Sequence, residues 1–211
     1  MFEITYYGGN ALELATKDAA LVFDANRSSF GKKSLVVKDA AEFATEERFL
    51  TNDPAFRVSL CGAGEYEVSN IMVQGVAAPR QLDDVKSELA STVFSVKVGD
   101  QRVAIIGNIQ GTLNDSQLEV LGMVDILVIP VGGNGYTLDA ADAAKIVAQI
   151  TPKIVVPIHY AETGYNYEVP QDSFDDFANT LKAEVIAEKT LKIKPGMTMP
   201  AALTIYKLAA Q

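Results

Sequence analysis

The chain has 211 residues, 48% of them hydrophobic, and a formal net charge of −9, with 27 acidic against 18 basic residues. This balance, without a large cluster of Lys and Arg, argues against nucleic acid as a partner, because a phosphate backbone attracts a cationic surface. No apolar run comes near the roughly 20 residues that span a bilayer, and one cysteine cannot form an internal disulfide, so we expect a single cytoplasmic domain, residues 1–211, that does not bind membranes.

The first half of the sequence alternates short apolar runs with turn residues, a pattern typical of β-strands. Gly8-Gly9-Asn10 and Gly99-Asp100 suit tight hairpin turns, because Gly, Asn and Asp tolerate the positive φ that these turns require. The strands joined by these turns should therefore be antiparallel. The expected strands cover residues 3–7, 11–16, 20–24, 57–60, 71–76, 92–98 and 102–106.

The second half places helices between the strands. Asn114 and Gln117 have the spacing of a capping box at the start of a short helix. A strand, a helix and a second strand follow, and this succession predicts a parallel pair. Two packed mixed sheets with helices outside, an αββα sandwich, fit the whole order of elements. The expected strands cover residues 125–130, 153–158, 184–187 and 203–207, and the two longer helices cover residues 140–150 and 172–183.

His159, the only histidine in the chain, follows the apolar strand 153–158. A polar imidazole at the mouth of a buried strand is a candidate ligand-binding or catalytic group. The alternative is a structural histidine whose ring bonds a neighbouring carbonyl. Imidazole-based metal sites usually need further nitrogens or thiolates, and the only thiol, Cys61, is distant in sequence. Glu65 and Glu67 share one strand face, either as an acid and a base or as part of a solvated sheet face.

Five segments resemble, in family order, a small family with the metallo-β-lactamase fold. The family is a short branch of predicted zinc-dependent hydrolases similar to the ascorbate-phosphate lactonase group, and the matches cover roughly residues 1–160. The resemblance implies the sandwich fold and a site with one or two metal ions that turn water into a nucleophile. The matching segments are Ile4–Gly9, Leu21–Asp24, Gly62–Val68, Val124–Gly133 and Pro152–Tyr160.

The resemblance also implies where the family's metal ligands should lie. Its His-x-His-x-Asp-His loop corresponds to segment 49–57 of this chain, and its last histidine corresponds to His159. At the other positions the chain has residues that differ from the family's ligands. The replaced positions are Asn52, Pro54, Phe56 and Arg57 in the loop, then Gly9, Pro79 or Arg80, and Asn108.

From these replacements we expect a non-catalytic protein that binds a small molecule or another protein and needs no cofactor. One neutral imidazole cannot compensate for the dehydration of Zn²⁺ as three or four strong ligands do. Guanidinium groups can take over the charge of a lost metal, so we expect a small anion, a carboxylate or a phosphate, as the ligand. The expected ligand-binding residues are Arg57, Arg80, Asn108 and His159.

The alternative is an atypical hydrolase of an ester, lactone or phosphoester with a reduced site around His159. Its catalytic candidates are His159, Asp53 and Glu65, and zinc or another divalent metal would be held by Asp24, Asp53 and His159. A homo-oligomer is a further expectation, because a mixed sheet leaves edges to cover and the helix segment 140–148 offers a flat face of small residues.

Overall fold

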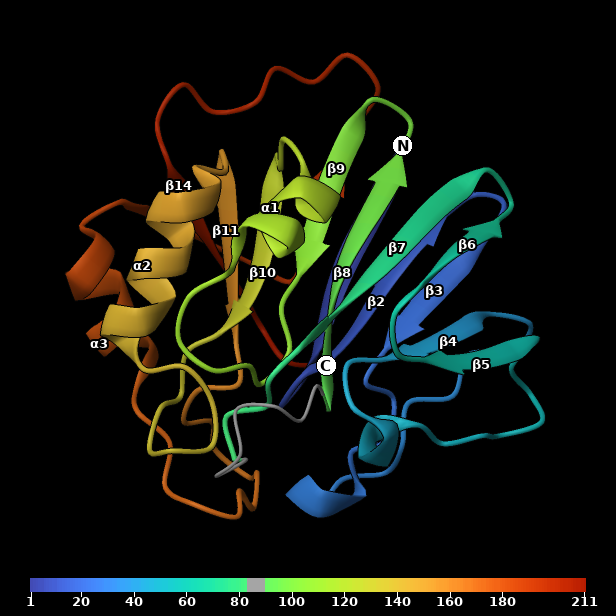
Figure 1. The fold of residues 1–211 in the computed structure, drawn as a ribbon, viewed down its shortest axis with the longest axis horizontal. Helices are drawn as coiled ribbons and strands as arrows, with labels where there is room; N and C mark the ends of the chain where they lie inside the picture. Colours follow the sequence, from blue (N-terminus) through green and yellow to red (C-terminus); the bar gives the residue numbers. More distant parts are fainter. Residues whose placement is uncertain (83–89) are drawn as a thin grey trace.

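The computed structural model describes residues 1–82 and 90–211, and its strands form two sheets packed face to face (Figure 1). The predicted two-sheet sandwich is confirmed. The first sheet has the order β13 (Thr190–Ile193), β1 (Phe2–Gly8), β2 (Ala11–Thr16), β3 (Ala20–Phe23), β4 (Ala41–Ala44), β5 (Val58–Cys61). The second has the order β12 (Glu184–Glu188), β14 (Thr204–Leu208), β11 (Ile154–Ile158), β10 (Ile126–Pro130), β9 (Gln101–Ile105), β8 (Ser91–Val98), β7 (Ile71–Ala78), β6 (Gly64–Val68).

Both sheets are mixed. The hairpins β1–β2 and β8–β9 are antiparallel, as their glycine turns predict, and β10 and β11 are parallel, as the intervening helix predicts. Parallel pairing also joins β3 to β4 and β9 to β10. Because the carboxyl ends of parallel strands lie at the same edge of a sheet, the residues that follow β3, β4, β9 and β11 come together at one edge of the sandwich.

The three α-helices of the described residues belong to the second sheet. In Figure 1 they lie on its outer side, where α1 (Asp115–Leu121) contacts β7 and β8, and α2 (Ala140–Ile150) contacts β10 and α3 (Phe174–Leu181). The predicted capping box is present, with Asn114 Oδ1 accepting from the Gln117 backbone N–H at 3.0 Å. Among the described residues, the segment between β3 and β5 contains β4 and, as its only helical structure, the 3₁₀ turns η1 (Ser28–Phe30) and η2 (Glu47–Phe49).

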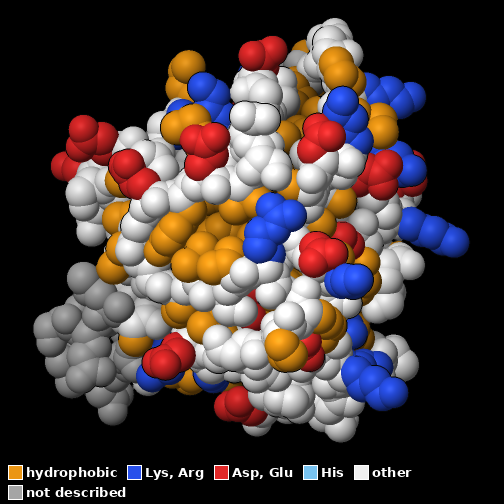
Figure 2. All heavy atoms as spheres, turned by 90° about the vertical axis from the view of Figure 1, so that its right-hand side faces the viewer, with side chains coloured by type: hydrophobic (Ala, Val, Ile, Leu, Met, Phe, Trp, Pro, Cys, Tyr) orange, Lys and Arg blue, Asp and Glu red, His pale blue; other side chains and the backbone are white. Residues whose placement is uncertain are grey.

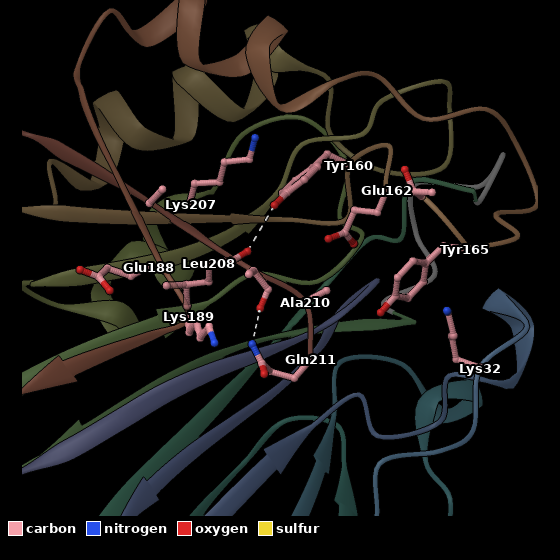
Figure 3. A pocket seen from close by; sticks show the side chains of 13 residues that line it. Lys32, Tyr160, Glu162, Tyr165, Glu188, Lys189, Lys207, Leu208, Ala210 and Gln211 are labelled. Carbon is pink, nitrogen blue, oxygen red and sulfur yellow. Dashed lines mark hydrogen bonds between the residues drawn. The ribbon is translucent and has the colours of Figure 1, made fainter.

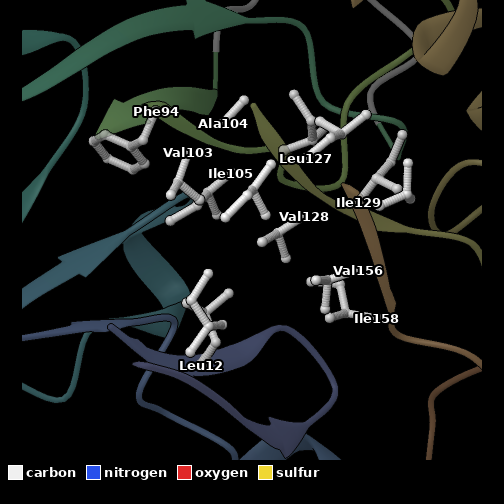
Figure 4. Packing of buried hydrophobic residues seen from close by; sticks show 14 of the residues in the cluster. Leu12, Phe94, Val103, Ala104, Ile105, Leu127, Val128, Ile129, Val156 and Ile158 are labelled. Atoms are coloured by element: carbon white, nitrogen blue, oxygen red, sulfur yellow. The ribbon is translucent and has the colours of Figure 1, made fainter. Parts of the chain in front are cut away.

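A continuous apolar core joins the inner faces of the two sheets. Figure 4 shows Leu12 of the first sheet facing Ile105, Val128 and Val156 of the second, and all four side chains are buried. Phe23 of β3, Phe43 of β4 and Phe94 of β8 pack with ring centroids 5.4 to 5.7 Å apart. This aromatic group fixes the ends of β3 and β4, which carry part of the site.

The sandwich is open on the side formed by the edge strands β5 and β6. Figure 2 shows apolar side chains gathered on this side of the molecule, with charged side chains around them. Leu60 of β5 and Tyr66 and Val68 of β6 pack against the core but are only partly buried. The open side lies away from the three α-helices, which cover the other end of the second sheet (Figure 1).

The strands β4 and β13 do not follow from the sequence pattern. All four residues of β4, Ala-Glu-Phe-Ala, are buried, although Ala and Glu are poor strand formers. This segment is a strand because it pairs in parallel with β3 and β5, and a local sequence pattern does not contain that information. Because the sequence pattern does not predict β4, it also does not predict that the residues directly after this strand belong to the site.

Candidate functional site

His159 follows β11 and lies at the centre of the site. Its side chain is fully buried, and its backbone has a φ of 51°, in the left-handed region that is uncommon outside glycine. Aromatic rings surround the imidazole, with centroids 5.3 Å away for Phe30, 5.2 Å for Tyr136 and 5.0 Å for Tyr167. Strained backbone of this kind is held only where the surrounding structure fixes it.

A chain of hydrogen bonds determines which nitrogen of His159 carries the proton. The Glu46 carboxylate can only accept, so the Asn108 Nδ2 group donates to it at 3.1 Å. Asn108 Oδ1 then accepts from Asn10 Nδ2 at 3.2 Å, and Asn10 Oδ1 faces His159 Nδ1. Nδ1 therefore carries the hydrogen, and Nε2 carries a free lone pair.

The Nε2 atom of His159 is buried and has no hydrogen-bond partner within the described part of the chain. Burial, with a smaller contribution from the Arg48 guanidinium, lowers the pKa of His159 to about 3. The imidazole is therefore neutral at pH 7 and presents an acceptor. A buried acceptor of this kind can accept a hydrogen bond from a bound group.

Glu46 joins the amide chain to two arginines. Its carboxylate contacts Arg48 Nε at 2.9 Å and an Arg80 terminal nitrogen at 3.3 Å. The Glu46 side chain is 1% exposed, whereas each guanidinium side chain is 30% exposed. The Glu46 carboxylate thus lies behind two partly exposed guanidinium groups, and the exposed Glu168 carboxylate lies 3.9 Å from an Arg48 terminal nitrogen.

Asp24 fixes the turn that presents Glu46. It follows β3 with a φ of 51°, and its carboxylate accepts from the Thr45 backbone N–H at 2.6 Å and from Thr45 Oγ1 at 2.7 Å. Burial raises the pKa of Asp24 to about 7, although the bonds from Thr45 act in the opposite direction. Because Thr45 directly precedes Glu46, these two hydrogen bonds fix the backbone position from which the Glu46 side chain extends.

Among the residues predicted from the sequence, the structure brings His159, Asn108 and Arg80 into one cluster, with Asp24 beside it. Asp53 and Arg57 lie on the loop before β5, where Asp53 Oδ1 accepts from the Ala55 N–H at 2.9 Å and Arg57 is exposed. Glu65 is exposed on the edge strand β6 and accepts from Gln74 at 3.2 Å. These three residues are not part of the His159 cluster.

Three members of the cluster are not among the residues predicted from the sequence: Asn10, Glu46 and Arg48. The segment that approaches His159 and Asn108 is the one directly after β4, with Glu46 and Arg48 two positions apart. The resemblance implies that the family's histidine loop corresponds to segment 49–57, whereas the residues that contribute Glu46 and Arg48 to the cluster lie directly after β4. A prediction of β4 would have identified Glu46 and Arg48 as candidates, because polar residues directly after a buried strand indicate a site.

The side chains of the cluster do not make an ordinary divalent-metal site. His159 Nε2 is the kind of atom that binds a metal, but no group of three or more His, Cys, Asp and Glu that could hold an ion occurs within residues 1–82 and 90–211. Glu46, the carboxylate at the end of the hydrogen-bond chain from His159, already contacts two guanidinium groups. Zinc sites usually use three or four strong donors, so the fit to such a centre is poor.

Comparison with known sequences gives a consistent family. A family model described as a beta-lactamase superfamily domain matches residues 3–159. The UPF0173 metal-dependent hydrolase of Aeropyrum pernix is 27% identical over 177 residues, covering 79% of this chain and 69% of that protein. The protein of the same name from Thermococcus onnurineus is 26% identical over 169 residues, with the same coverage.

Two solved structures share the fold. A Thermotoga maritima protein assigned as a Zn-dependent hydrolase of the metallo-β-lactamase superfamily has a TM-score of 0.76 and 19% identity, covering 99% of this chain and 100% of its own. A metallo hydrolase from Ignicoccus hospitalis has a TM-score of 0.65 and 15% identity, covering 92% of this chain and 99% of its own. At these identities the likeness shows the fold, which agrees with the prediction.

The expectation of a non-catalytic protein that needs no cofactor is wrong. The relatives that align with 79% of the chain are named metal-dependent hydrolases. The expectation rests on replaced ligands in segment 49–57, whereas the segment directly after β4 contributes Glu46 and Arg48 to the cluster of His159, Asn108 and Arg80. In the described residues, no helix is long and apolar enough to cross a membrane.

Proposed function

The chain belongs to the beta-lactamase superfamily domain family, and we propose that it is a hydrolase of an ester, lactone or phosphoester with its reaction centre at the His159 cluster. The observation that carries this proposal is the unpartnered Nε2 atom of His159, buried and held in one tautomer by Asn10. The left-handed backbone of both Asp24 and His159 supports it, because such strain is concentrated at functional sites.

Each polar group of the cluster has a role that its position suits. Arg48 and Arg80, partly exposed in front of Glu46, bind a negatively charged or developing oxyanion oxygen of the substrate through charge-assisted hydrogen bonds. The neutral His159 imidazole accepts a hydrogen bond at Nε2 from the attacking water and orients it. Glu46 and Asn108 are positioning residues that hold the arginines and the imidazole in place.

The names of the relatives imply a divalent metal, which in such enzymes makes bound water a nucleophile at neutral pH. The described donor set does not fit an ordinary zinc centre, so none of the roles above depends on a metal. We also propose that Glu46 and Arg48 stand in the family's histidine loop. Metal analysis of the purified protein, together with the imidazole NMR signal of its single histidine during Zn²⁺ addition, tests whether this loop, with Glu46 and Arg48 in it, still takes part in holding a metal.

The hydrolase proposal is tested with p-nitrophenyl acetate, bis(p-nitrophenyl) phosphate and a γ-lactone, each with and without added Zn²⁺ or Mn²⁺. Replacing Arg48 with Met removes the oxyanion contact, and we expect a rate loss of about 10²-fold or more on the best substrate. The matched control is Arg57→Met, which makes the same charge change at an exposed position outside the cluster. The control rate should stay within about twofold of the wild-type rate.

His159→Asn is the second test variant and should lose activity to a similar extent. Circular dichroism and the melting temperature of both variants establish that they fold. Equal rates for Arg48→Met and Arg57→Met would refute the assignment of the reaction centre. Absence of hydrolysis of all three substrate classes, with every metal, would refute the proposed activity.

A further inference from the structure

A cavity of about 820 Å³ lies next to the His159 cluster and is lined by a different set of residues. Its wall is made by the loop after β11, the turn between β12 and β13, the end of β14 and Lys32. Figure 3 shows Lys32 and Tyr165 on one side of the cavity and Glu188 and Lys189 on the opposite side. The volume is that of a site for a small organic molecule.

Lysine side chains outnumber acidic side chains in the wall of the cavity, although the chain is acidic. Lys32, Lys189 and Lys207 line it, against the two carboxylates Glu162 and Glu188, in a chain with a formal net charge of −9. None of the three lysines forms an ion pair with another residue of the ranges 1–82 and 90–211. Other lysines are paired, for example Lys192 with Glu3 at 3.2 Å. A concave surface with unpaired ammonium groups attracts small anions.

Aromatic rings hold two of these ammonium groups in place. Lys32 Nζ lies 4.5 Å from the centroid of the Tyr165 ring, and Lys207 Nζ lies 4.3 Å from that of Phe174. Tyr165 is itself fixed by a 2.8 Å hydrogen bond from its hydroxyl to the Tyr7 carbonyl. Cation–π contacts of this kind reduce the freedom of a lysine without neutralising it. The two cations are therefore pre-positioned at the cavity wall.

The main opposing carboxylate in the cavity is Glu162, and two tyrosine hydroxyls already donate hydrogen bonds to it. Its Oε2 atom accepts hydrogen bonds from the Tyr6 hydroxyl at 2.7 Å and from the Tyr167 hydroxyl at 3.2 Å. Burial raises the pKa of Glu162, while the bonds from the two tyrosines and the charge of Lys207 act in the opposite direction. Tyr160 and Leu208 supply apolar surface beside it. The cavity thus combines cations with an aromatic and apolar wall.

Glu162 also connects the cavity to the His159 cluster. The Tyr6 hydroxyl that donates to Glu162 accepts from the His159 backbone N–H at 3.2 Å. The Tyr167 ring, whose hydroxyl also donates to Glu162, lies against the imidazole. A shift of the Glu162 carboxylate therefore moves two groups that touch His159.

We propose that this cavity is a second ligand site, which binds the charged group of a small organic anion through Lys189 and Lys207 and places the apolar or aromatic body of that anion against Tyr160 and Tyr165, beside Lys32. The anionic group is a carboxylate or a phosphate. This inference does not depend on the proposed hydrolase activity, because binding is measured without a substrate of the reaction.

The test is an amide NMR titration of the full chain with three probes of similar shape: benzoate, phenyl phosphate and the neutral benzamide. We expect one or both anions to shift the amides of residues 187–189 and 207–211, with little effect of benzamide. The anion that binds with the higher affinity identifies whether the site prefers a carboxylate or a phosphate. Equal effects of benzamide and benzoate would show that charge is not recognised and would overturn the proposal, as would shifts confined to the surroundings of Arg48 and Arg80.

Variants distinguish binding of the anion in this cavity from non-specific attraction of anions to lysine side chains. The double variant Lys189→Ala, Lys207→Met removes two cations and keeps an apolar stem against Phe174, so we expect the affinity for the preferred anion to fall about tenfold or more. The double variant Lys38→Ala, Lys97→Met, which also removes two cations but at exposed positions outside the cavity lining, is the matched control and should leave the affinity unchanged. An equal loss in both variants would overturn the site.

The single histidine provides an independent readout of the connection. We expect the imidazole signal of His159 to shift with the same half-saturation as the cavity amides in the wild-type protein. Glu162→Gln, which weakens the link to Tyr6 and Tyr167, should reduce the shift at His159 and retain binding. Cavity shifts in the wild type without a change at His159 would overturn the connection through Glu162.

Discussion

At the scale of single residues, Asp24 and His159 are a matched pair with opposite responses to burial. Each follows a strand, each has a φ of 51°, and each is nearly or fully buried. Desolvation disfavours the charged form of both, so it raises the pKa of Asp24 to about 7 and lowers the pKa of His159 to about 3. Both side chains are therefore held in their neutral forms in the folded protein over much of the acidic range.

The two shifts act on stability in opposite directions. Between about pH 4 and 6.5 the unfolded chain binds a proton at His159 that the folded protein excludes, so this contribution to stability increases with pH. Over the same range the folded protein keeps a proton on Asp24 that the unfolded chain releases, so that contribution decreases with pH. Each slope is about 1.4 kcal/mol per pH unit, and together they offset one another.

Single substitutions should expose each slope. Relative to the wild type, the free energy of unfolding of Asp24→Asn should increase with pH by about 1.4 kcal/mol per unit between about pH 4.5 and 6. That of His159→Gln should decrease with pH by the same amount. Urea unfolding at several pH values measures both, and the comparison with the wild type cancels the other carboxylates. Parallel pH profiles for all three proteins would contradict the assigned shifts.

At the scale of secondary-structure elements, β4 organises the loop that follows it through Glu42. This side chain is fully buried, and its carboxylate accepts from the Thr51 N–H at 2.6 Å, from the Asn52 N–H at 3.2 Å and from the Ser59 hydroxyl. The loop between η2 and β5 is thus hydrogen-bonded to the strand before it. A buried carboxylate with three donors stabilises the conformation of this loop.

Replacing Glu42 should therefore be strongly destabilising. Glu42→Ala leaves two backbone N–H groups and a hydroxyl without their acceptor, and we expect a loss of about 2–4 kcal/mol in the free energy of unfolding. Glu47→Ala, at an exposed position of η2, removes the same charge and should change it by less than about 0.5 kcal/mol. Urea titration at pH 7 compares them. A loss in Glu42→Ala no larger than in Glu47→Ala would refute this role.

The same strand explains what the sequence could and could not predict. Elements with strong periodic patterns or caps, such as the capping box at Asn114 and the apolar strand before His159, are where they were expected. The Ala-Glu-Phe-Ala strand has neither signal, because its burial comes from pairing with distant strands. His159, Asn108 and Arg80 were predicted, whereas Glu46 and Arg48 depend on β4. Asn10 resembles an ordinary hairpin residue until its contact with His159 is seen.

At the scale of the whole molecule, one apolar core connects the two sheets. The same cluster contains Leu12 and Phe23 of the first sheet and Val128 and Val156 of the second. The site is also shared, because Asp24 and Glu46 follow strands of the first sheet, whereas Asn108 and His159 follow strands of the second. Neither sheet can bury its inner face alone, so the two should form a single cooperative unit.

This cooperativity predicts that a substitution in one sheet destabilises the other equally. Leu12→Ala removes a buried side chain of the first sheet, and we expect a loss of about 2–5 kcal/mol and a fall in melting temperature of roughly 5–15 °C. Amide NMR signals of Val22 in β3 and Leu127 in β10 report the two sheets during heating. Both should disappear at one midpoint in the wild type and at one lower midpoint in the variant. If the β10 signal keeps its wild-type midpoint while the β3 signal moves, the sheets unfold separately and residues 1–211 are not one domain.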